Sequence, residues 1–431
     1  MEKISSLPGF RDFYPGDLAL RNHIFRGWRR VAERYGFVEY DGPPLEPLEL
    51  YTRKSGEEIV EQLYAFEDRG GREVALRPEM TPTFARLVSA RARALPKPIK
   101  WYSLPQLFRY ERPQRGRLRE HFQLNLDIVG EEDVLADAEL VAAAVDVLRE
   151  FGLDEDDVEA RINDRRLAAG LLRDVGVEGD ALQNAFAALD KADRESREWV
   201  LGRLGEAGAD PDAAADLLEE LEAAGPDEIV DRAAGASEDA AAAAERLRRL
   251  FRHLDDFGVG DYVRYDAGLV RGLAYYTGTV FELWDRGGEL RAVCGGGRYD
   301  DLLASLGGVD LPALGFGMGD VVLAELLRDR GLAPEPDAGL DDFVVVVSEE
   351  QRSLALELVH ALRERGRSVG FDYRARSVGR QFGAADQAGA RRAILLGPDE
   401  VGRGRALVRE MATGEEEELQ LERLMEGEES A

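Results

Sequence analysis

Hydrophobic and polar positions change period several times along the first third of the chain. After Pro15, apolar residues recur every three or four positions until Gly36, which predicts a helix between them. Apolar and polar residues alternate in 61–81 and 101–130, and in each segment the alternating runs flank a turn or loop. These two segments are therefore predicted hairpins, and residues 131–151 return to helical spacing.

The remaining chain contains a helical stretch and a second region of strands. Residues from about 175 to 250 are rich in Ala, Asp, Glu and Leu at helical spacing, which predicts a solvated helical module inserted in the main domain. Strand patterns resume at Asp261, and residues 331–342 have the Pro, Gly and acidic composition of a linker. Beyond it a small mixed or parallel sheet is predicted. Its strands are expected at 343–347, 368–373 and 393–396, and its helices at 350–365 and 380–389.

The charge balance is strongly acidic. The chain has 431 residues, enough for two to four domains, and 56 Lys and Arg against 85 Asp and Glu give a formal net charge of −29. This charge opposes binding to nucleic-acid phosphates or anionic membranes unless arginines gather locally. An acidic, lysine-poor surface is typical of proteins that work in concentrated salt, where screening removes the self-repulsion. A GC-rich genome would explain the few lysines but not the acidic excess, so we expect a salt-adapted protein.

Cysteine usage and hydropathy indicate a cytoplasmic protein. The single cysteine, Cys294, excludes an intrachain disulfide framework and suits a reducing compartment. No Cys or His cluster has zinc spacing, so no metal site is expected. No apolar run is long enough to span a membrane, and the start, MEKISSLPGF, lacks the apolar core of a signal peptide.

The densest positive patch lies on the loop of the second predicted hairpin. Five guanidinium groups within eleven residues, with Gly116 at the loop tip, suit the phosphates of a polyphosphate or a nucleic acid. The alternative is a surface loop with alternating salt bridges, which the local reversal of sign makes less favourable. The arginines are Arg109, Arg112, Arg115, Arg117 and Arg119, with Glu111 and Glu120 beside them.

Two glycine-rich segments, 294–299 and 315–319, permit close approach of the backbone to a ligand, and tight packing explains them equally well. Neither has the spacing of a dinucleotide-binding fingerprint or of a P-loop.

Two groups of polar residues suggest a small-molecule pocket. Glu79 and Thr81 follow an apolar strand and can jointly hold an ammonium group. Arg271 precedes the pair Tyr275 and Tyr276, an arrangement that suits an anion and a polar ring. A core strand with a polar rim explains either group about as well.

Together these segments resemble the histidyl-tRNA synthetases, which are class II aminoacyl-tRNA synthetases, over nearly the whole chain. The segment most specific to that family is RGLAYYTGTVFE at 271–282. With the acidic composition, the resemblance suggests a member from a salt-adapted archaeon. The other matching segments are RPEMT, FRYERPQRGRLREHFQLNLDIVG (motif 2), CGGGRYDDLL followed by GFGMG (the motif 3 region), GFVEYDGPPLEP with Pro43 (motif 1), and RSVGRQFGAADQAGARRAILLGPDE, which resembles a class IIa anticodon-binding domain.

The resemblance implies an α+β fold, with an antiparallel-sheet catalytic core, a helical insertion and a C-terminal α/β anticodon-binding domain. It also implies a homodimer built on motif 1. The expected parts are 1–170 (catalytic core with motifs 1 and 2), 171–255 (helical insertion), 256–330 (catalytic core with the histidine signature and motif 3 region), 331–342 (linker) and 343–431 (anticodon-binding domain).

The resemblance implies a role for each residue of the amino-acid site. Arg109 would bridge the histidine carboxylate and the ATP α-phosphate, where Arg271 would stabilise developing charge. Asp127 and Tyr276 would bond the two imidazole nitrogens, a pairing that selects a ring with a donor and an acceptor. The α-ammonium would be held by Glu79, Thr81 and Gln123, with Tyr275 and Tyr299 lining the wall.

The nucleotide and tRNA sites are implied in the same way. Glu111 would accept from the adenine amino group, Arg117 would hold the β- and γ-phosphates, and His121 would stack on adenine. The ATP site would also include Gly315 and Gly317. The implied tRNA contacts are Arg112 and Arg115 at the acceptor stem and Arg374, Arg376 and Arg380 near the anticodon.

Three positions depart from the family pattern. Val322 stands where motif 3 normally has an arginine, and His121 stands where the family usually has phenylalanine. Asp127 stands where the family often has glutamate, so the pocket geometry shifts by one methylene. The first two departures fall on the adenine and γ-phosphate side, while the histidine side is intact.

The implied reaction has two steps. The histidine carboxylate attacks the α-phosphate of ATP, which carries Mg²⁺ on its phosphates, and histidyl-adenylate forms; the terminal ribose of tRNA(His) then takes the histidyl group. One alternative is the synthetase-like regulatory subunit of ATP phosphoribosyltransferase, against which residues 343–431 and the intact 271–282 segment argue. Another is a non-catalytic RNA- or protein-binding descendant, which Val322 keeps open.

Overall fold

The structure is a computed structural model of the chain. It describes residues 4–52, 61–192, 195–223, 226–234, 237–270, 275–288, 290–334, 339–374 and 376–426. The chain divides into two compact units, and the main division lies between Ala333 and Pro334. Each unit has its own sheet and hydrophobic core.

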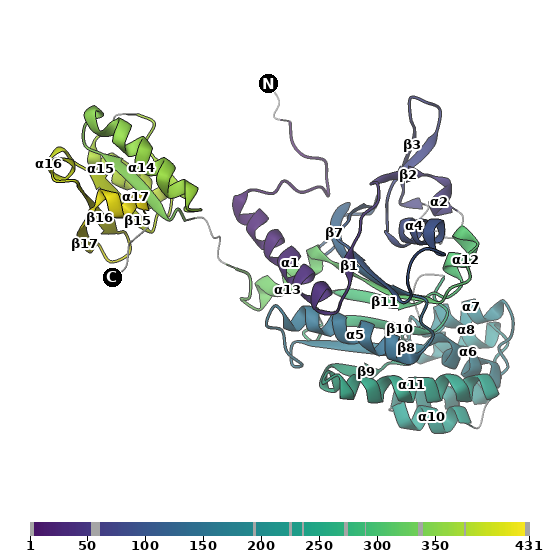
Figure 1. Cartoon of the computed structure of the whole chain (residues 1–431). Coiled ribbons are helices and arrows are strands. Elements are labelled where there is room, and N and C mark those ends of the chain that lie inside the picture. The colour runs from purple at the N-terminus through teal and green to yellow at the C-terminus, as the bar shows by residue number, and fades with distance from the viewer. Residues whose placement is uncertain are drawn as a thin grey trace. The chain divides into compact units, whose positions relative to one another are not determined.

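The larger unit is built on a sheet that contains nine strands in the described residues (Figure 1). Its central strands are antiparallel, while β1 pairs with β5 and β8 with β9 in parallel, which confirms the predicted antiparallel core. The short β6 (Gln106–Phe108) pairs with the start of β7. In sheet order the strands are β1 (Val38–Glu39), β5 (Ile99–Ser103), β7 (Glu120–Val129), β12 (Ala313–Gly319), β11 (Cys294–Arg298), β10 (Thr279–Asp285), β8 (Val158–Asp164) and β9 (Val263–Tyr265).

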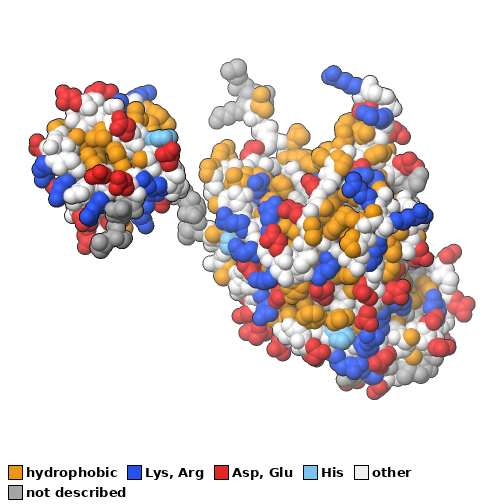
Figure 2. Space-filling view, viewed as in Figure 1, with side chains coloured by type: hydrophobic (Ala, Val, Ile, Leu, Met, Phe, Trp, Pro, Cys, Tyr) orange, Lys and Arg blue, Asp and Glu red, His pale blue; other side chains and the backbone are white. Residues whose placement is uncertain are grey.

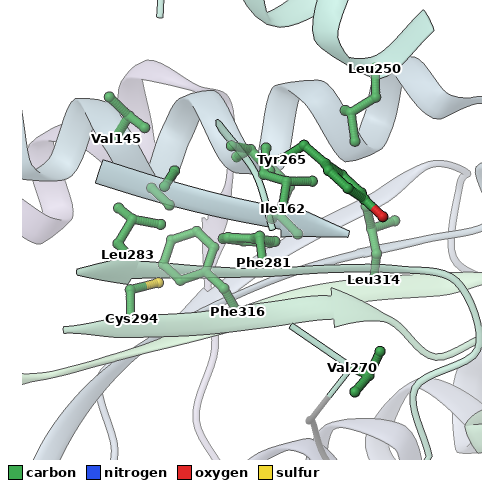
Figure 3. Packing of buried hydrophobic residues seen from close by; sticks show 14 of the residues in the cluster. Val145, Ile162, Leu250, Tyr265, Val270, Phe281, Leu283, Cys294, Leu314 and Phe316 are labelled. Atoms are coloured by element: carbon green, nitrogen blue, oxygen red, sulfur yellow. The ribbon is translucent and has the colours of Figure 1, made fainter. Parts of the chain in front are cut away.

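The core of this unit lies between the sheet and the helices that pack on it. Helix α5 (Val134–Arg149) is almost wholly buried, and Asp133 caps it by accepting from Leu135 N at 2.9 Å. Figure 3 shows Phe281 and Phe316, on neighbouring parts of the sheet, with Val145 of α5 and Leu250 on the helical side. The two phenylalanine rings meet edge to face at 6.2 Å. Helix α1 (Pro15–Arg34) adds Ile24 and Trp28 to the same core.

The stretch expected to be helical between about 175 and 250 is helical in the structure. Helix α11 is capped by Ser237, carries Glu238 and Asp239 in its first turn, and packs against α5, α6 and α10. The helices of this part are α6 (Arg165–Asp174), α7 (Ala181–Leu189), α8 (Arg197–Glu206), α9 (Pro211–Ala223), α10 (Pro226–Ala234) and α11 (Glu238–Asp256).

A three-stranded sheet and several short elements complete the larger unit. The predicted hairpin at 61–81 is present, and Asp68 Oδ1 accepts from the amides of Gly70 and Arg72 in its turn. The small sheet has the order β2 (Leu45–Pro47), β4 (Glu73–Leu76) and β3 (Tyr64–Glu67). The helices are α2 (Glu49–Thr52), α4 (Thr81–Arg91), α12 (Leu302–Gly307) and α13 (Asp320–Asp329), with a 3₁₀ turn η1 (Gly260–Tyr262).

The second unit has a mixed sheet, as predicted, with the strand order β14-β13-β15-β16-β17. Its first three strands are parallel and its last two are antiparallel. The elements are β13 (Asp342–Val346), η2 (Glu349–Gln351), α14 (Arg352–Glu364), β14 (Val369–Phe371), α15 (Val378–Gln387), β15 (Arg392–Leu396), α16 (Pro398–Gly402), β16 (Arg405–Glu410), β17 (Glu416–Gln420) and α17 (Leu421–Glu426).

The glycine-rich segments lie within strands. The first forms most of β11, and the second forms the last five residues of β12. These strands pair with one another, Gly297 opposite Gly315 and Gly295 opposite Gly317. The absence of side chains at these positions creates space above the middle of the sheet, where the candidate site lies.

Candidate active site

A buried carboxylate lies on a central strand of the larger sheet. Asp127 of β7 faces Gly315 of β12, and it is only 2% exposed. The hydroxyl of Tyr299 donates to Oδ1, whereas Oδ2 is buried and has no hydrogen-bond partner among the described residues. Burial raises the pKa of Asp127 to about 7, although the hydrogen bond from Tyr299 opposes this shift. Because an unpartnered buried acceptor is costly, its position favours a ligand that donates a hydrogen bond there.

Three tyrosine rings pack edge to face beside this carboxylate. The ring centroid of Tyr275 lies 5.4 Å from that of Tyr276 and 5.8 Å from that of Tyr299. The Tyr275 hydroxyl donates to Glu79 Oε2 at 3.2 Å, which joins the aromatic wall to a second buried carboxylate. Burial and then the charge of Glu79 raise the pKa of Tyr275 well above its ordinary value, so this phenol stays protonated. Thr81, also buried, stands beside the same hydroxyl as the first residue of α4.

Glycines make room for the polar side chains of this pocket. A Cβ on Gly315 would lie 2.2 Å from Oδ1 of Asp127, and a Cβ on Gly317 would lie 2.6 Å from Nε2 of Gln123. On the next strand, a Cβ on Gly297 would lie 2.6 Å from a main-chain oxygen and 3.3 Å from the Tyr276 ring. The observed contacts of Gly315 and Gly317 are therefore with the side chains of β7. Their predicted place in the ATP site stays a prediction.

We predict that Gly315→Ala destabilises the protein by about 1–3 kcal/mol, because the new methyl group forces the Asp127 side chain out of its position. Gly295→Ala is the matched control on the paired strand, since its Cβ would meet nothing closer than Glu282 Cγ at 3.8 Å. Thermal denaturation followed by circular dichroism compares the two variants. Equal midpoints would show that the strand tolerates the methyl group and that the space is not required.

The arginine loop forms the opposite, cationic side of the site. Arg109 donates from Nε to the carbonyl of Pro78 at 2.8 Å, which ties the loop to the Glu79 segment. Glu111 is buried and forms an ion pair with Arg117. Burial, followed by the charge of Arg109, lowers the pKa of His121 to about 3, so this imidazole is neutral at neutral pH. A neutral ring beside several guanidiniums can stack on a base without adding charge.

The other arginines of the loop face elsewhere. Arg115 pairs with Asp329 of α13 at 2.7 Å and with Glu325 at 3.4 Å, and Arg112 is exposed. Arg119 donates to the main chain of Glu111, and its guanidinium lies 4.2 Å from the centroid of the Tyr110 ring. The salt bridges expected of an ordinary surface loop are thus partly present. Arg109 differs, because its side chain is hydrogen-bonded to the segment that carries Glu79.

The structure brings together most of the predicted histidine-site residues, but one of them is not among the described residues. Asp127, Glu79 and the three tyrosines meet in one pocket, and Gln123 borders it beside Gly317. Arg271 lies outside the described residues.

Two arginines at this site had no recognisable signal in the sequence. Arg11 donates to Glu120 at 2.6 Å and to Asp320 at 2.9 Å, which connects the N-terminal segment, β7 and α13. Arg291, before β11, acts electrostatically on His121 together with Arg109 and Arg11. Both lie far along the chain from the arginine loop, so only the folded structure shows that they belong to its surroundings.

A cavity of about 700 Å³ lies between the pocket and the helical module. Tyr276 and Thr277 border it from the pocket side. Four arginines line it, two of them paired with buried aspartates: Arg165, Arg166, Arg173 and Arg246. Asp180 and Asp239 also line the cavity, so guanidiniums outnumber carboxylates there by four to two. This excess suits an anionic group that reaches the pocket from the side of the helices.

The second unit carries an exposed aromatic ring close in the chain to exposed arginines. Tyr373 is 86% exposed, and its ring meets that of Phe371 at 5.0 Å just after β14. Arg374 directly follows Tyr373 and Arg380 lies in the first turn of α15, and both are exposed. Figure 2 shows acidic and basic side chains intermixed over the visible face of each unit. An exposed aromatic ring beside arginines is an arrangement typical of single-stranded nucleic-acid binding.

No group of three or more His, Cys, Asp or Glu side chains in the described ranges is placed to hold a metal ion. Within the same ranges, no helix is long and apolar enough to cross a membrane.

Two family models match the chain. The model described as histidyl-tRNA synthetase matches residues 9–320, and the model described as anticodon binding domain matches residues 342–427.

Similar curated proteins and solved structures carry corresponding names. The chain is 43% identical over 428 residues to the histidine–tRNA ligase of Opitutus terrae, covering 98% of each. It is 42% identical over 424 residues to that of Halorubrum lacusprofundi, covering 96% of this chain and 95% of the relative. It is 40% identical over 413 residues to the chloroplastic/mitochondrial histidine–tRNA ligase of Arabidopsis thaliana, covering 96% and 84%. A histidyl-tRNA synthetase structure from Nostoc superposes with a TM-score of 0.84 at 25% identity and covers 99% of both chains.

Proposed function

The chain belongs to the histidyl-tRNA synthetase family and ligates L-histidine to tRNA(His) with ATP, and we propose that its two clusters of polar residues divide this reaction. The Asp127 pocket takes the amino acid, and the arginine loop takes the nucleotide. The observation that carries this division is the buried, half-satisfied carboxylate of Asp127 among three tyrosines.

In the pocket, Oδ2 of Asp127 accepts from one imidazole nitrogen of histidine and the Tyr276 hydroxyl bonds the other. Oδ1 is already engaged by Tyr299, so the carboxylate is held in one orientation before the substrate arrives. Glu79, Thr81 and Gln123 hold the α-ammonium, and Tyr275 reinforces Glu79 through its hydrogen bond. A site built this way rejects any side chain that does not carry both a donor and an acceptor, because one of its buried polar groups would then be unpaired.

On the other side, Arg109 bridges the histidine carboxylate and the ATP α-phosphate. Arg117 exchanges its ion pair with Glu111 for the β- and γ-phosphates, which frees Glu111 to accept from the adenine amino group. His121 stacks on adenine as a neutral ring. Arg271 joins Arg109 at the α-phosphate during in-line attack. Mg²⁺ enters on the ATP phosphates and neutralises part of their charge.

Transfer to tRNA requires a second surface. We assign the exposed ring of Tyr373, with Arg374 and Arg380, to the anticodon arm because it combines stacking with positive charge. Arg112 and Arg115 are assigned to the acceptor stem. The cavity lined by arginines beside Tyr276 offers an approach for the terminal phosphates of the acceptor end.

The wider organisation follows the family. Residues 1–170 and 256–330 form the catalytic core, 171–255 the insertion, 331–342 the linker and 343–431 the anticodon-binding domain; the observed division after Ala333 supports this assignment. Two copies form a homodimer through motif 1, where β1 lies at the edge of the sheet with Val38 62% exposed. The enzyme works in the cytoplasm, as its single buried cysteine favours.

Amino-acid-dependent ATP–pyrophosphate exchange tests this function. We expect exchange with histidine and none with the other amino acids, followed by charging of tRNA(His). If histidine binds but no amino acid supports exchange, the protein would instead be the regulatory subunit or the non-catalytic descendant. The family match at 43% identity over almost the full chain supports the ligase.

We further propose that the enzyme is salt-adapted and of archaeal origin. The net charge of −29 implies strong self-repulsion at low ionic strength. Activity and the thermal midpoint should therefore rise between about 0.1 M salt, where the Debye length is about 10 Å, and about 1 M, where it is about 3 Å. A salt series with both readouts checks this. Full activity and an unchanged midpoint at the lowest salt would contradict salt adaptation without affecting the synthetase assignment.

A further inference from the structure

Arg291 meets the tip of the arginine loop from a different part of the sheet. It lies on the connection between β10 and β11, 175 positions after Gly116 at the loop tip. A Cβ on Gly116 would lie 3.8 Å from Cδ of Arg291 and 3.4 Å from Cγ2 of Val322. The stem of Arg291, the loop tip and the side chain of Val322 therefore meet around Gly116.

The charges around Arg291 are unbalanced. Its pKa is lowered by burial first and then by the charge of Arg117, with a smaller contribution from Arg109. Glu111 and, more weakly, Glu282 oppose this shift; Glu111 is already paired with Arg117, and Glu282 accepts a hydrogen bond from Trp284. In the part of the chain that the structure describes, Arg291 itself forms no hydrogen bond or ion pair.

Two other arginines, one in β11 and one next to β10, have acidic partners. Arg298 of β11 pairs with Asp137 at 2.5 Å, and Arg286 lies 3.5 Å from Glu159. Arg291 is exposed, so solvent screens its charge, but its guanidinium adds to the positive charge of Arg117 and Arg109. A polyanion bound among the three groups would balance this charge.

We propose that Arg291 binds the terminal phosphates of ATP and supplies the guanidinium at the position where Val322 brings only an apolar side chain. This inference rests on the proposed nucleotide site and extends it by one residue. Arg117 is the charge that acts most strongly on Arg291, and it is assigned to the β- and γ-phosphates. Arg291 therefore holds the pyrophosphate end, away from the α-phosphate that reacts.

Arg291→Ala tests the proposal, with Arg286→Ala as the matched control in the same connection. We expect the KM for ATP in histidine-dependent exchange to rise about tenfold or more in Arg291→Ala, the loss typical of a charge-assisted hydrogen bond, and to change less than about twofold in the control. The KM for histidine should stay near wild type in both variants.

A ligand without the terminal phosphates separates binding from structure. A histidyl-sulfamoyl-adenosine, which carries the amino acid and adenosine but no β- or γ-phosphate, should bind Arg291→Ala and the wild type equally by calorimetry. Equal loss of affinity for this analogue and for ATP would overturn the assignment, because the variant would then have damaged the whole pocket. An ATP affinity unchanged within twofold would also overturn it.

A second variant moves the charge. Arg291→Ala combined with Val322→Arg should recover most of the ATP affinity, since both side chains meet at Gly116. A double variant that binds ATP no better than the single one would refute the shared position. ATP titration by calorimetry does not depend on catalysis. Failure of exchange in the wild type would count against the proposed function, while the ATP titrations would still decide the role of Arg291.

Discussion

Arg109→Ala should lower histidine-dependent ATP–pyrophosphate exchange by about 10²–10³-fold in kcat/KM, because it removes positive charge where the transition state develops negative charge. The Arg109 side chain is held by its hydrogen bond to Pro78 O, next to Glu79. Its terminal nitrogens have no ion-pair partner in the described ranges and are available to a carboxylate and a phosphate. The side chain thus connects the two clusters that share the reaction.

Arg109→Lys refines this experiment. Lysine keeps the charge but lacks the planar fork that can bridge two anions, so an intermediate loss of about tenfold is expected. Thermal midpoints of both variants should lie close to the wild-type value, since Arg109 contributes one hydrogen bond to a main-chain carbonyl. A folded Arg109→Ala variant that exchanges within threefold of the wild type would remove Arg109 from the catalytic site.

Individual elements of the fold could be predicted because their signals are local, whereas the class II architecture was implied by the family resemblance. The helix before Gly36, the 61–81 hairpin and the strands around the arginine loop each follow from periodicity within a short segment. The polar residues of the histidine pocket were also predictable as a group, since each belongs to a recognisable segment. That Asp127 is held by Tyr299, with one oxygen left over, depends on packing between β7 and the residue after β11.

Other features depend on contacts across the sheet and have no local signal. The glycines of β12 suited close approach of a ligand and tight packing equally well, and only the structure shows that Asp127 and Gln123 leave no room for a side chain there. Arg291 has no motif of its own, and its surroundings come from Gly116 and Val322, which lie in two distant segments. The last two strands of the second unit, β16 and β17, carry many charged residues on a partly exposed edge, which weakens the alternation that identifies a strand.

Removal of residues 340–431 should leave adenylate formation largely intact and reduce charging of tRNA(His) by about 10²-fold or more, since binding energy from remote parts of a substrate is lost. The cores support this separation. The apolar clusters of the larger unit end at Ala333, and those of the second unit begin at Leu340. The cut therefore falls in a part of the chain that belongs to neither core. Exchange and aminoacylation assays on the same preparation measure the two steps.

Point variants in the full-length chain show which surface is responsible. Tyr373→Ala should reduce tRNA kcat/KM about tenfold, within the range of about 1–3 kcal/mol for one stacked base, and leave pyrophosphate exchange unchanged. Arg403→Ala is the control. This arginine pairs with Glu418 at 2.9 Å and is distant from Tyr373 in the chain. A truncated enzyme that charges tRNA as well as the full chain would refute the anticodon-binding role. If truncation impairs charging while Tyr373→Ala does not, the domain is confirmed as necessary and the contact must lie on another of its faces.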